Sequence, residues 1–164
     1  MNCTSDKIKR ICNFYISDLH FAVMLLPYIN NELSNGTSIE LFFEKSMQAC
    51  MTVLLEKINI ENRNKILELN WKKEEDTNNI DERIKQVLNK RGKKIFIING
   101  NNNYINEVNN KIDKYLKFEK LCNNELRIID CYKVEENERE MYKIIKMHDS
   151  ILNTIGEQDI EKIV

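Results

Sequence analysis

The residues of this chain that offer nucleophilic chemistry are its cysteines, with its two histidines as candidate bases. A hydrolase or transferase site needs a nucleophile, a base and a group that orients the base. His148 paired with Cys12 or Cys131 is the combination that fits this requirement best. Both cysteines fall within predicted strands, where a thiol is usually buried and inert. A small Cys/His-dependent hydrolase or transferase is therefore the third-ranked hypothesis.

Two other features have the residue types of a ligand site. The run from Asn99 to Tyr104 (NGNNNY) is the most polar strand-to-helix turn of the chain, and a helix beginning there would present free backbone donors. The same run also fits a plain Asn-rich turn, because Asn tolerates left-handed backbone conformations. His148 interrupts an apolar stripe. Its imidazole fits either a ligand contact or a half-buried histidine that is hydrogen-bonded to a carbonyl.

The glycine-rich loops that bind phosphate groups are missing from the chain. After the first predicted strand, the segment from Tyr15 to Asp18 (YISD) leads directly into a helix, with no GxxxxGK[ST] or GxGxxG pattern. Without glycines the backbone cannot easily wrap a triphosphate, and Asp18 adds a negative charge. The sequence thus argues against ATP binding of the P-loop kind.

The cysteines predict neither a metal site nor a disulfide framework. They are five in number and scattered without a CxxC pair: Cys3, Cys12, Cys50, Cys122 and Cys131. Zinc sites need ligands at short spacings, so we expect no metal and no cofactor. An odd, scattered set of cysteines is typical of a reducing compartment, and we expect a cytoplasmic location.

The composition of the 164 residues excludes several classes of protein. The 25 Lys and Arg against 26 Asp and Glu give a formal charge of −1, which argues against a nucleic-acid surface. No apolar run approaches the ~20 residues needed to span a bilayer, and the first ten residues are too polar for a secretory signal. We therefore expect no nucleic acid and no membrane among its partners. Four Gly and one Pro argue against a turn-dense β architecture.

Short apolar runs alternate with stretches of helical spacing, which positions these residues in an α/β fold. The predicted strands are Ile11–Ser17, Ser38–Glu44, Ile66–Trp71, Lys94–Asn99 and Leu126–Val134. The predicted helices are Asp18–Asn35, Ser46–Ile58, Ile80–Leu88, Asn103–Leu116 and Met141–Ile155. Pro27 should kink or divide the first helix. The alternation implies βαβ crossovers, hence a three-layer α/β sandwich with a mostly parallel five-stranded sheet. No linker or repeat is visible, so we expect a single domain over residues 1–164.

Three segments, taken in order, resemble the MEDS domain, the sensory domain of the dichloromethane-responsive repressor type. The first, Ile11 to Tyr15 (ICNFY), is similar to the family's His-Ile-Cys-x-Phe-Tyr and is followed by Leu26 to Ile29 (LPYI). The second is Ile98 to Asn101 (INGN) with Tyr104. The third is Ile129 to Tyr132 (IDCY), followed by Met141 to His148 and Gly156-Glu157. The resemblance covers roughly residues 9–160. Arg10 and Gln158 stand where the family has a leading His and a final Trp.

The resemblance implies a RecA-like fold without a P-loop and a role in sensing small molecules, hydrocarbon derivatives among them. The family passes its signal to attached output domains, for which we expect no room in this chain. We therefore predict a non-enzymatic sensory module for a small, largely apolar ligand, signalling through a separate protein partner such as a regulator or kinase. A homo-oligomer is compatible with this prediction. The alternative is a protein-interaction or scaffold module with no small ligand.

The predicted ligand pocket lies near the ends of the first, fourth and fifth predicted strands. Open parallel sheets bind ligands at the carboxyl ends of their strands, where strand order reverses. Small-molecule pockets combine apolar walls with a few polar anchors. The candidate lining residues are Tyr15, Asn99, Asn101, Tyr104, Tyr132 and His148.

Overall fold

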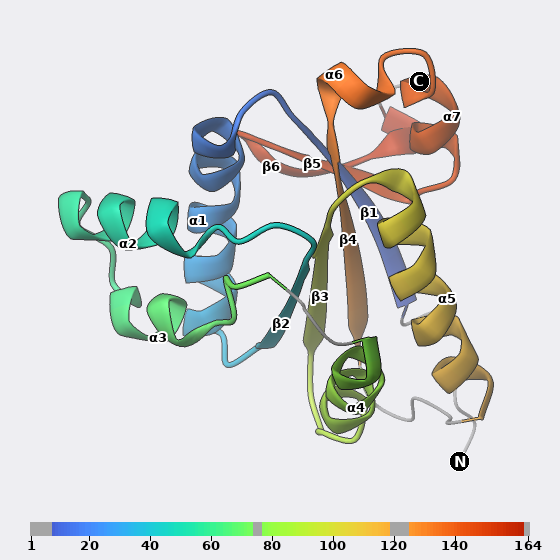
Figure 1. The fold of residues 1–164 in the computed structure, drawn as a ribbon, viewed down its shortest axis with the longest axis horizontal. Coiled ribbons are helices and arrows are strands. Elements are labelled where there is room, and N and C mark those ends of the chain that lie inside the picture. The colour runs from blue at the N-terminus through green and yellow to red at the C-terminus, as the bar shows by residue number, and fades with distance from the viewer. Residues whose placement is uncertain (1–7, 74–76, 119–124, 163–164) are drawn as a thin grey trace.

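Figure 1 shows the computed structural model, which describes residues 8–73, 77–118 and 125–162. Cys3 and Cys122 lie outside the described residues. The described residues form a six-stranded sheet in the order β2-β3-β4-β1-β5-β6. Its strands are β1 (Ile8–Tyr15), β2 (Ser38–Phe43), β3 (Lys94–Asn99), β4 (Leu126–Lys133), β5 (Ser150–Asn153) and β6 (Gly156–Asp159).

The sheet is parallel except at one edge. The strands β1 to β5 all run in the same direction, whereas β6 pairs with β5 in the antiparallel sense. β1 lies in the middle, where Ile11 is opposite Ile129 of β4 on one side and Ser150 of β5 on the other. The predicted α/β class with a mostly parallel sheet is therefore confirmed, with six strands in place of five.

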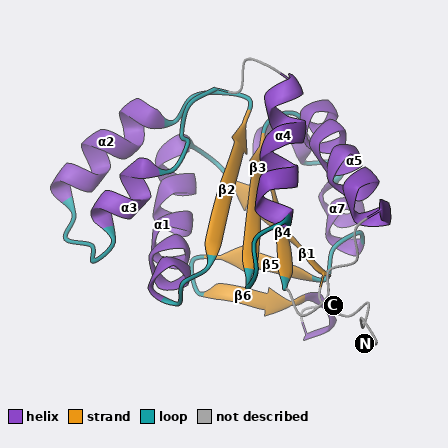
Figure 2. Cartoon of the chain, turned by 90° about the horizontal axis from the view of Figure 1, so that it is seen from below, coloured by secondary structure: helices purple, strands orange, loops and turns teal. Residues whose placement is uncertain are grey.

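Helices cover both faces of this sheet, as the layers in Figure 2 show. The helices are α1 (Asp18–Ser34), α2 (Gln48–Lys57), α3 (Arg63–Glu68), α4 (Thr77–Leu88), α5 (Asn102–Phe118), α6 (Val134–Asn137) and α7 (Met141–Lys146), with a 3₁₀ turn at Ile160–Lys162. The first three lie together on one side of the sheet, and α4, α5 and α7 lie on the other. The predicted three-layer sandwich is thus observed.

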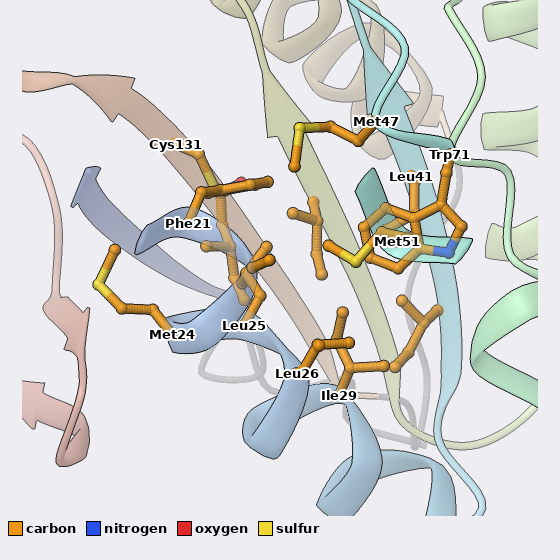
Figure 3. Packing of buried hydrophobic residues seen from close by; sticks show 14 of the residues in the cluster. Phe21, Met24, Leu25, Leu26, Ile29, Leu41, Met47, Met51, Trp71 and Cys131 are labelled. Carbon is orange, nitrogen blue, oxygen red and sulfur yellow. The ribbon is translucent and has the colours of Figure 1, made fainter. Parts of the chain in front are cut away.

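Each face of the sheet has its own hydrophobic core. On the α1 face, Phe21, Leu25 and Ile29 project from the helix toward strand residues, and Trp71 packs in the same cluster (Figure 3). On the other face, Ile105, Val108 and Ile112 of α5 pack against strand residues of β3 and β4. The sheet is therefore buried on both sides. This explains why all six residues of β3 are buried, including the polar residues at its two ends.

The first helix begins and ends as the sequence predicts. Ser17 is its N-cap, and the Ser17 hydroxyl accepts a hydrogen bond from the backbone N–H of His20 at 3.2 Å. Gly36 follows its end with a φ of 78°, a left-handed conformation that glycine adopts at low cost. Pro27 lies inside the helix, which nevertheless runs as one element from Asp18 to Ser34. The division that Pro27 predicted is not observed.

The predicted strand Ile66–Trp71 is wrong, because this segment forms the short helix α3 and the turn after it. Ile66 is fully buried while Leu67 is 39% exposed. The indole N–H of Trp71 donates to the backbone oxygen of Ile66 at 2.8 Å, so the chain folds back on itself here. A short apolar run has no periodicity that separates a strand from one buried helical turn, which is why the pattern misled.

The predicted helix Met141–Ile155 is wrong beyond Lys146, where α7 ends. The chain then forms β5 and β6. Ile155, in the turn between them, is 80% exposed, and Gly156, the first residue of β6, has a φ of 106°. β5 alternates buried and half-buried residues, as a strand does. Apolar residues at 151, 152 and 155 happen to continue the helical spacing of α7, so a two-strand hairpin was read as helix.

Candidate functional site

A crevice opens at the edge of the sheet where β1, β2, β3 and β4 end. Its volume is about 260 Å³. The residues that line it all lie at or just after these strand ends: Tyr15, Asp18, Glu44, Lys45, Ser46, Met47, Asn99, Gly100, Asn101, Lys133 and Glu136. The crevice includes the ends of the three strands named from the sequence and adds the end of β2.

The strand connections explain why the crevice lies at this edge. β1 leads into α1 on one face of the sheet, whereas β3 and β4 lead into α5 and α6–α7, whose packed residues lie on the other face. β1 and β4 are direct neighbours. Because their outgoing connections separate to opposite faces, they leave space between them at the carboxyl ends of the strands, which is where open α/β sheets bind ligands.

The inner part of the crevice holds a buried hydrogen bond between two predicted site residues. The Tyr15 hydroxyl donates to Oδ1 of Asn99 at 2.7 Å, and the two side chains are only 7% and 8% exposed. Burial, with a smaller contribution from the nearby Cys131, raises the pKa of the Tyr15 phenol above its usual range. Tyr15 therefore stays a neutral donor at any ordinary pH, and it fixes the orientation of the Asn99 amide.

The rim of the crevice is built around a close approach between Glu44 and the start of α5. The backbone N–H of Asn101 donates to Oε1 of Glu44 at 3.0 Å, and Oδ1 of Asn101 accepts from the backbone N–H of Tyr104 at 2.8 Å. Gly100 lies between them. A Cβ at this position would stand 2.5 Å from Cδ1 of Tyr104 and 2.9 Å from Cβ of Glu44. Glycine is thus required here by space.

Replacing Gly100 with alanine is expected to lower the free energy of unfolding by about 1–3 kcal/mol, the usual cost of overpacking. The added methyl group meets the Tyr104 ring and the Glu44 side chain. Urea unfolding followed by circular dichroism measures the change. Asn102→Ala, an exposed position in the same turn, serves as the control and should cost well under half as much. Equal effects of the two substitutions would show that the close approach at Gly100 does not exist.

The six predicted site residues do not gather in one place. Tyr15, Asn99 and Asn101 line the crevice, and Tyr104 lies next to it against Gly100. The other two, Tyr132 and His148, do not line the crevice and pack on the face of the sheet that α5 and α7 cover, with their rings edge to face at a centroid distance of 6.1 Å. The sequence pattern could not separate these groups, because Tyr132 lies at a predicted strand end as Tyr15 and Asn99 do, and the spacing of His148 does not show which residues it contacts.

Five charged residues of the crevice were not among the predicted site residues: Asp18, Glu44, Lys45, Lys133 and Glu136. The sequence does carry a signal for four of them, since Asp18, Glu44-Lys45 and Lys133 lie at or next to the carboxyl ends of three predicted strands. Lys45 and Lys133 form no ion pair with another residue in the described part of the chain. The crevice therefore offers charged groups that a ligand can bind.

His148 forms a buried pair with Asp130 of β4. Nε2 of His148 lies 2.7 Å from Oδ2 of Asp130, and Nδ1 lies 2.6 Å from the backbone oxygen of Ile144. Each of these side chains is 5% exposed. The other Asp130 oxygen accepts from the Asn109 amide at 2.8 Å, and Arg10 donates in turn to the oxygen of Asn109 at 3.0 Å. Both ring nitrogens already have oxygen partners, which matches the structural alternative given for this histidine.

The two candidate nucleophiles are buried beneath the sheet surface. Cys12 and Cys131 are both 0% exposed. Burial, with a smaller contribution from the charge of Asp130, raises the pKa of the Cys12 thiol to about 12. Burial likewise raises the pKa of Cys131 well above its usual range. Both residues are therefore thiols at neutral pH, which is the unreactive form.

Thiol reagents are expected to modify Cys50 before Cys12 or Cys131 in the folded protein. With a pKa near 12 in place of 9.0, Cys12 has roughly a thousandfold less thiolate at about pH 8. Peptide mapping by mass spectrometry after timed labelling measures the order. Cys50 is partly exposed on α2 and provides the internal control. Rapid labelling of Cys12 or Cys131 without unfolding would contradict the buried arrangement and favour the Cys/His enzyme.

Comparisons with known proteins find no relative of this chain. No family model, curated protein or solved structure matches the chain. Among the described residues, no cluster of three or more His, Cys, Asp or Glu side chains has the arrangement of a metal site. No helix in the described ranges has the length and apolar character needed to span a bilayer.

Proposed function

We propose that the chain is a sensory module that binds a small molecule in the crevice at the ends of β1 to β4 and signals through a separate protein partner. The observation that carries the proposal is the crevice of about 260 Å³. The nearly buried side chains of Tyr15 and Asn99 line its inner part, and their hydrogen bond fixes their orientation. Such a combination of a concave site with a few fixed polar groups is typical of ligand pockets. The volume suits a ligand smaller than a nucleotide.

The lining of the crevice favours a polar ligand over the largely apolar one predicted from the sequence. Met47 is the one aliphatic side chain among the residues that line it, whereas five of the others carry a charge. A hydrocarbon would leave these charged groups without partners. The resemblance to the MEDS domain supports the sensory role, and the sensory role therefore remains part of the proposal.

The effect of ligand binding in this crevice can be transmitted to a partner protein through the segment that follows β4. Lys133 and Glu136 line the crevice, and they lie at the start of the α6–α7 connection. The far end of this connection is held to β4 by the contact between His148 and Asp130. A ligand that binds one arrangement of the connection more tightly would shift its population, and a partner that contacts α6 or α7 would read the change.

A thermal-shift screen of small alcohols, acids, amines and amino acids tests the proposal. A ligand at about 100 times its Kd is expected to add ~2.7 kcal/mol to the free energy of unfolding. Ser46→Trp places a large ring in the crevice from an exposed position and should abolish the shift. Glu56→Trp, on the exposed side of α2, should leave the shift unchanged. A shift that survives Ser46→Trp would place the ligand elsewhere.

The second candidate is a protein-interaction or scaffold module with no small ligand. One observation favours it: Ile16, Leu19 and Val23 are 70%, 58% and 52% exposed at and near the start of α1. Leu19 and Val23 are four residues apart, so they share one side of the helix. Sedimentation at increasing concentration, for the parent and Val23→Lys, tests this candidate. A monomer at all concentrations would count against a homo-oligomeric scaffold.

A further inference from the structure

Glu44 occupies the position at the start of α5 where helices commonly bind anions. The first backbone N–H groups of a helix point out of its N-terminus, and the helix dipole favours negative charge there. In this chain the backbone N–H of Asn101, next to the first residue of α5, donates to Oε1 of Glu44 at 3.0 Å. The protein's own carboxylate therefore takes the place that a phosphate group takes in many α/β proteins.

Glu44 is held in this place by its backbone as well as by its side chain. Its backbone N–H donates to the oxygen of Asn99 at 2.9 Å, which continues the pairing of β2 with β3 by one residue. Gly100 allows the close approach, since a Cβ there would stand 2.9 Å from Cβ of Glu44. A carboxylate fixed in this way keeps its position when a ligand enters.

The other charges of the crevice define which ligands it admits. Asp18 and Glu136 add two carboxylates to that of Glu44, against the ammonium groups of Lys45 and Lys133. A phosphate-bearing ligand would meet three carboxylates, and one of them already accepts the hydrogen bond from the backbone N–H of Asn101. An ammonium group donates up to three hydrogen bonds, which carboxylates accept. The two lysines can bind a carboxylate at the other end of the same molecule.

We propose that Glu44 determines the specificity of the crevice, so that it binds a small ammonium-bearing molecule, best a zwitterion with a carboxylate at its other end, and excludes phosphate. The inference rests on the proposed binding of a small molecule in this crevice. It adds the chemical class of the ligand and the residue that selects it.

Titration calorimetry with four probes tests this assignment at constant ionic strength: γ-aminobutyrate, butylamine, butyrate and inorganic phosphate. The first three share one carbon chain and differ in the charged groups at its ends. We expect γ-aminobutyrate to bind best, butylamine more weakly, and butyrate and phosphate not measurably. Glu44→Gln keeps the shape of the side chain and removes its charge. It should weaken γ-aminobutyrate binding roughly tenfold or more and allow phosphate to bind.

The matched control is Glu56→Gln, which removes one negative charge from an exposed position on α2 and should leave all four affinities unchanged. Binding of phosphate or butyrate to the parent protein as tight as that of γ-aminobutyrate would overturn the role of Glu44, while binding in the crevice would stand. An unchanged affinity in Glu44→Gln would overturn it as well. If none of the four probes bound the parent or Glu44→Gln, the ammonium class would be wrong, and a flat thermal-shift screen would then reject the crevice as a ligand site.

Discussion

Replacing His148 with leucine is expected to lower the free energy of unfolding by about 3–5 kcal/mol, because it leaves the buried Asp130 carboxylate without its hydrogen-bonded partner. Nε2 of His148 and Oδ2 of Asp130 are 2.7 Å apart, and both side chains are 5% exposed. The amide of Asn109 would then be the main donor left to Asp130. Urea unfolding followed by the fluorescence of the single tryptophan measures the loss.

Two further variants separate this charge effect from a simple loss of packing. The double variant Asp130→Asn/His148→Leu removes the unpaired charge and should recover most of the stability lost by His148→Leu alone. His20→Leu changes the other histidine, whose ring accepts a hydrogen bond from the exposed backbone N–H of Ile16, and should cost less than about 1 kcal/mol. If the double variant were less stable than His148→Leu, the two side chains would not act as a pair.

Because His148 is packed apart from the crevice, His148→Leu is also expected to leave the Kd of a crevice ligand unchanged wherever the protein remains folded. A ligand contact by His148 would instead weaken binding without a matching loss of stability. This variant therefore distinguishes the two interpretations of the histidine that the sequence left open.

Replacing Trp71 with alanine is expected to lower the free energy of unfolding by about 3–5 kcal/mol, the cost of removing a large buried side chain. Trp71 is 2% exposed, and its ring meets that of Phe43 edge to face at 5.6 Å. Its indole N–H donates to Ile66, and its backbone oxygen accepts from Met47, which lines the crevice. Trp71→Ala removes the ring contact with Phe43 and the indole hydrogen bond to Ile66 of α3, while the backbone hydrogen bond to Met47 is retained.

Circular dichroism follows this unfolding, since the variant has no tryptophan fluorescence. Trp71→Phe keeps a ring and loses the donor to Ile66, so its cost should be intermediate, about 1–3 kcal/mol. Leu67→Ala, at a 39% exposed position of the same segment, should cost less than about 1 kcal/mol. A large loss in Leu67→Ala would mean that Leu67 faces the core, in contradiction to the helical arrangement of this segment.

Alkaline conditions are expected to destabilise the fold through its buried thiols and phenols. Burial raises the pKa of Cys12 from 9.0 to about 12 and that of Tyr28 from 10.0 to about 12. As the pH rises through the unfolded values, the unfolded chain releases protons that the folded chain still holds, so the stability falls. Melting temperatures should decrease between about pH 9 and pH 12. The decrease should be smaller in Cys12→Ala measured against its own value at neutral pH.

The parts of the fold that the sequence predicted well are those in which burial is continuous or strictly periodic. Lys94–Asn99 is a run covered on both faces, and its predicted bounds agree with β3. α1 has a capping serine and a terminal glycine at the expected places. The segment around Ile66 had no such signals, because a single helical turn and a short strand bury similar residues. The hairpin of β5 and β6 was missed for a related reason, since its apolar positions continued the spacing of α7.

The candidate site was only partly predictable, because its arrangement depends on contacts between residues far apart in the chain. Asn99 and Asn101 could be named from one polar turn, and Tyr15 from the end of a strand. The contact between Glu44 and Asn101 spans 57 residues, and it depends on the pairing of β2 with β3. The partner of His148 lies 18 residues away on β4, whereas His148 itself lies between α7 and β5. No local pattern carries either pairing.

The central claim is that a small molecule binds in the crevice at the ends of β1 to β4. An amide ¹H–¹⁵N NMR titration with the ligand that gives the largest thermal shift tests it most directly. We expect saturable shifts of the amide signals of Gly100, Asn101 and Lys133, with those around Asn109 and His148 unchanged. Shifts confined to the opposite face of the sheet, or spread weakly over the whole spectrum without saturation, would contradict the claim.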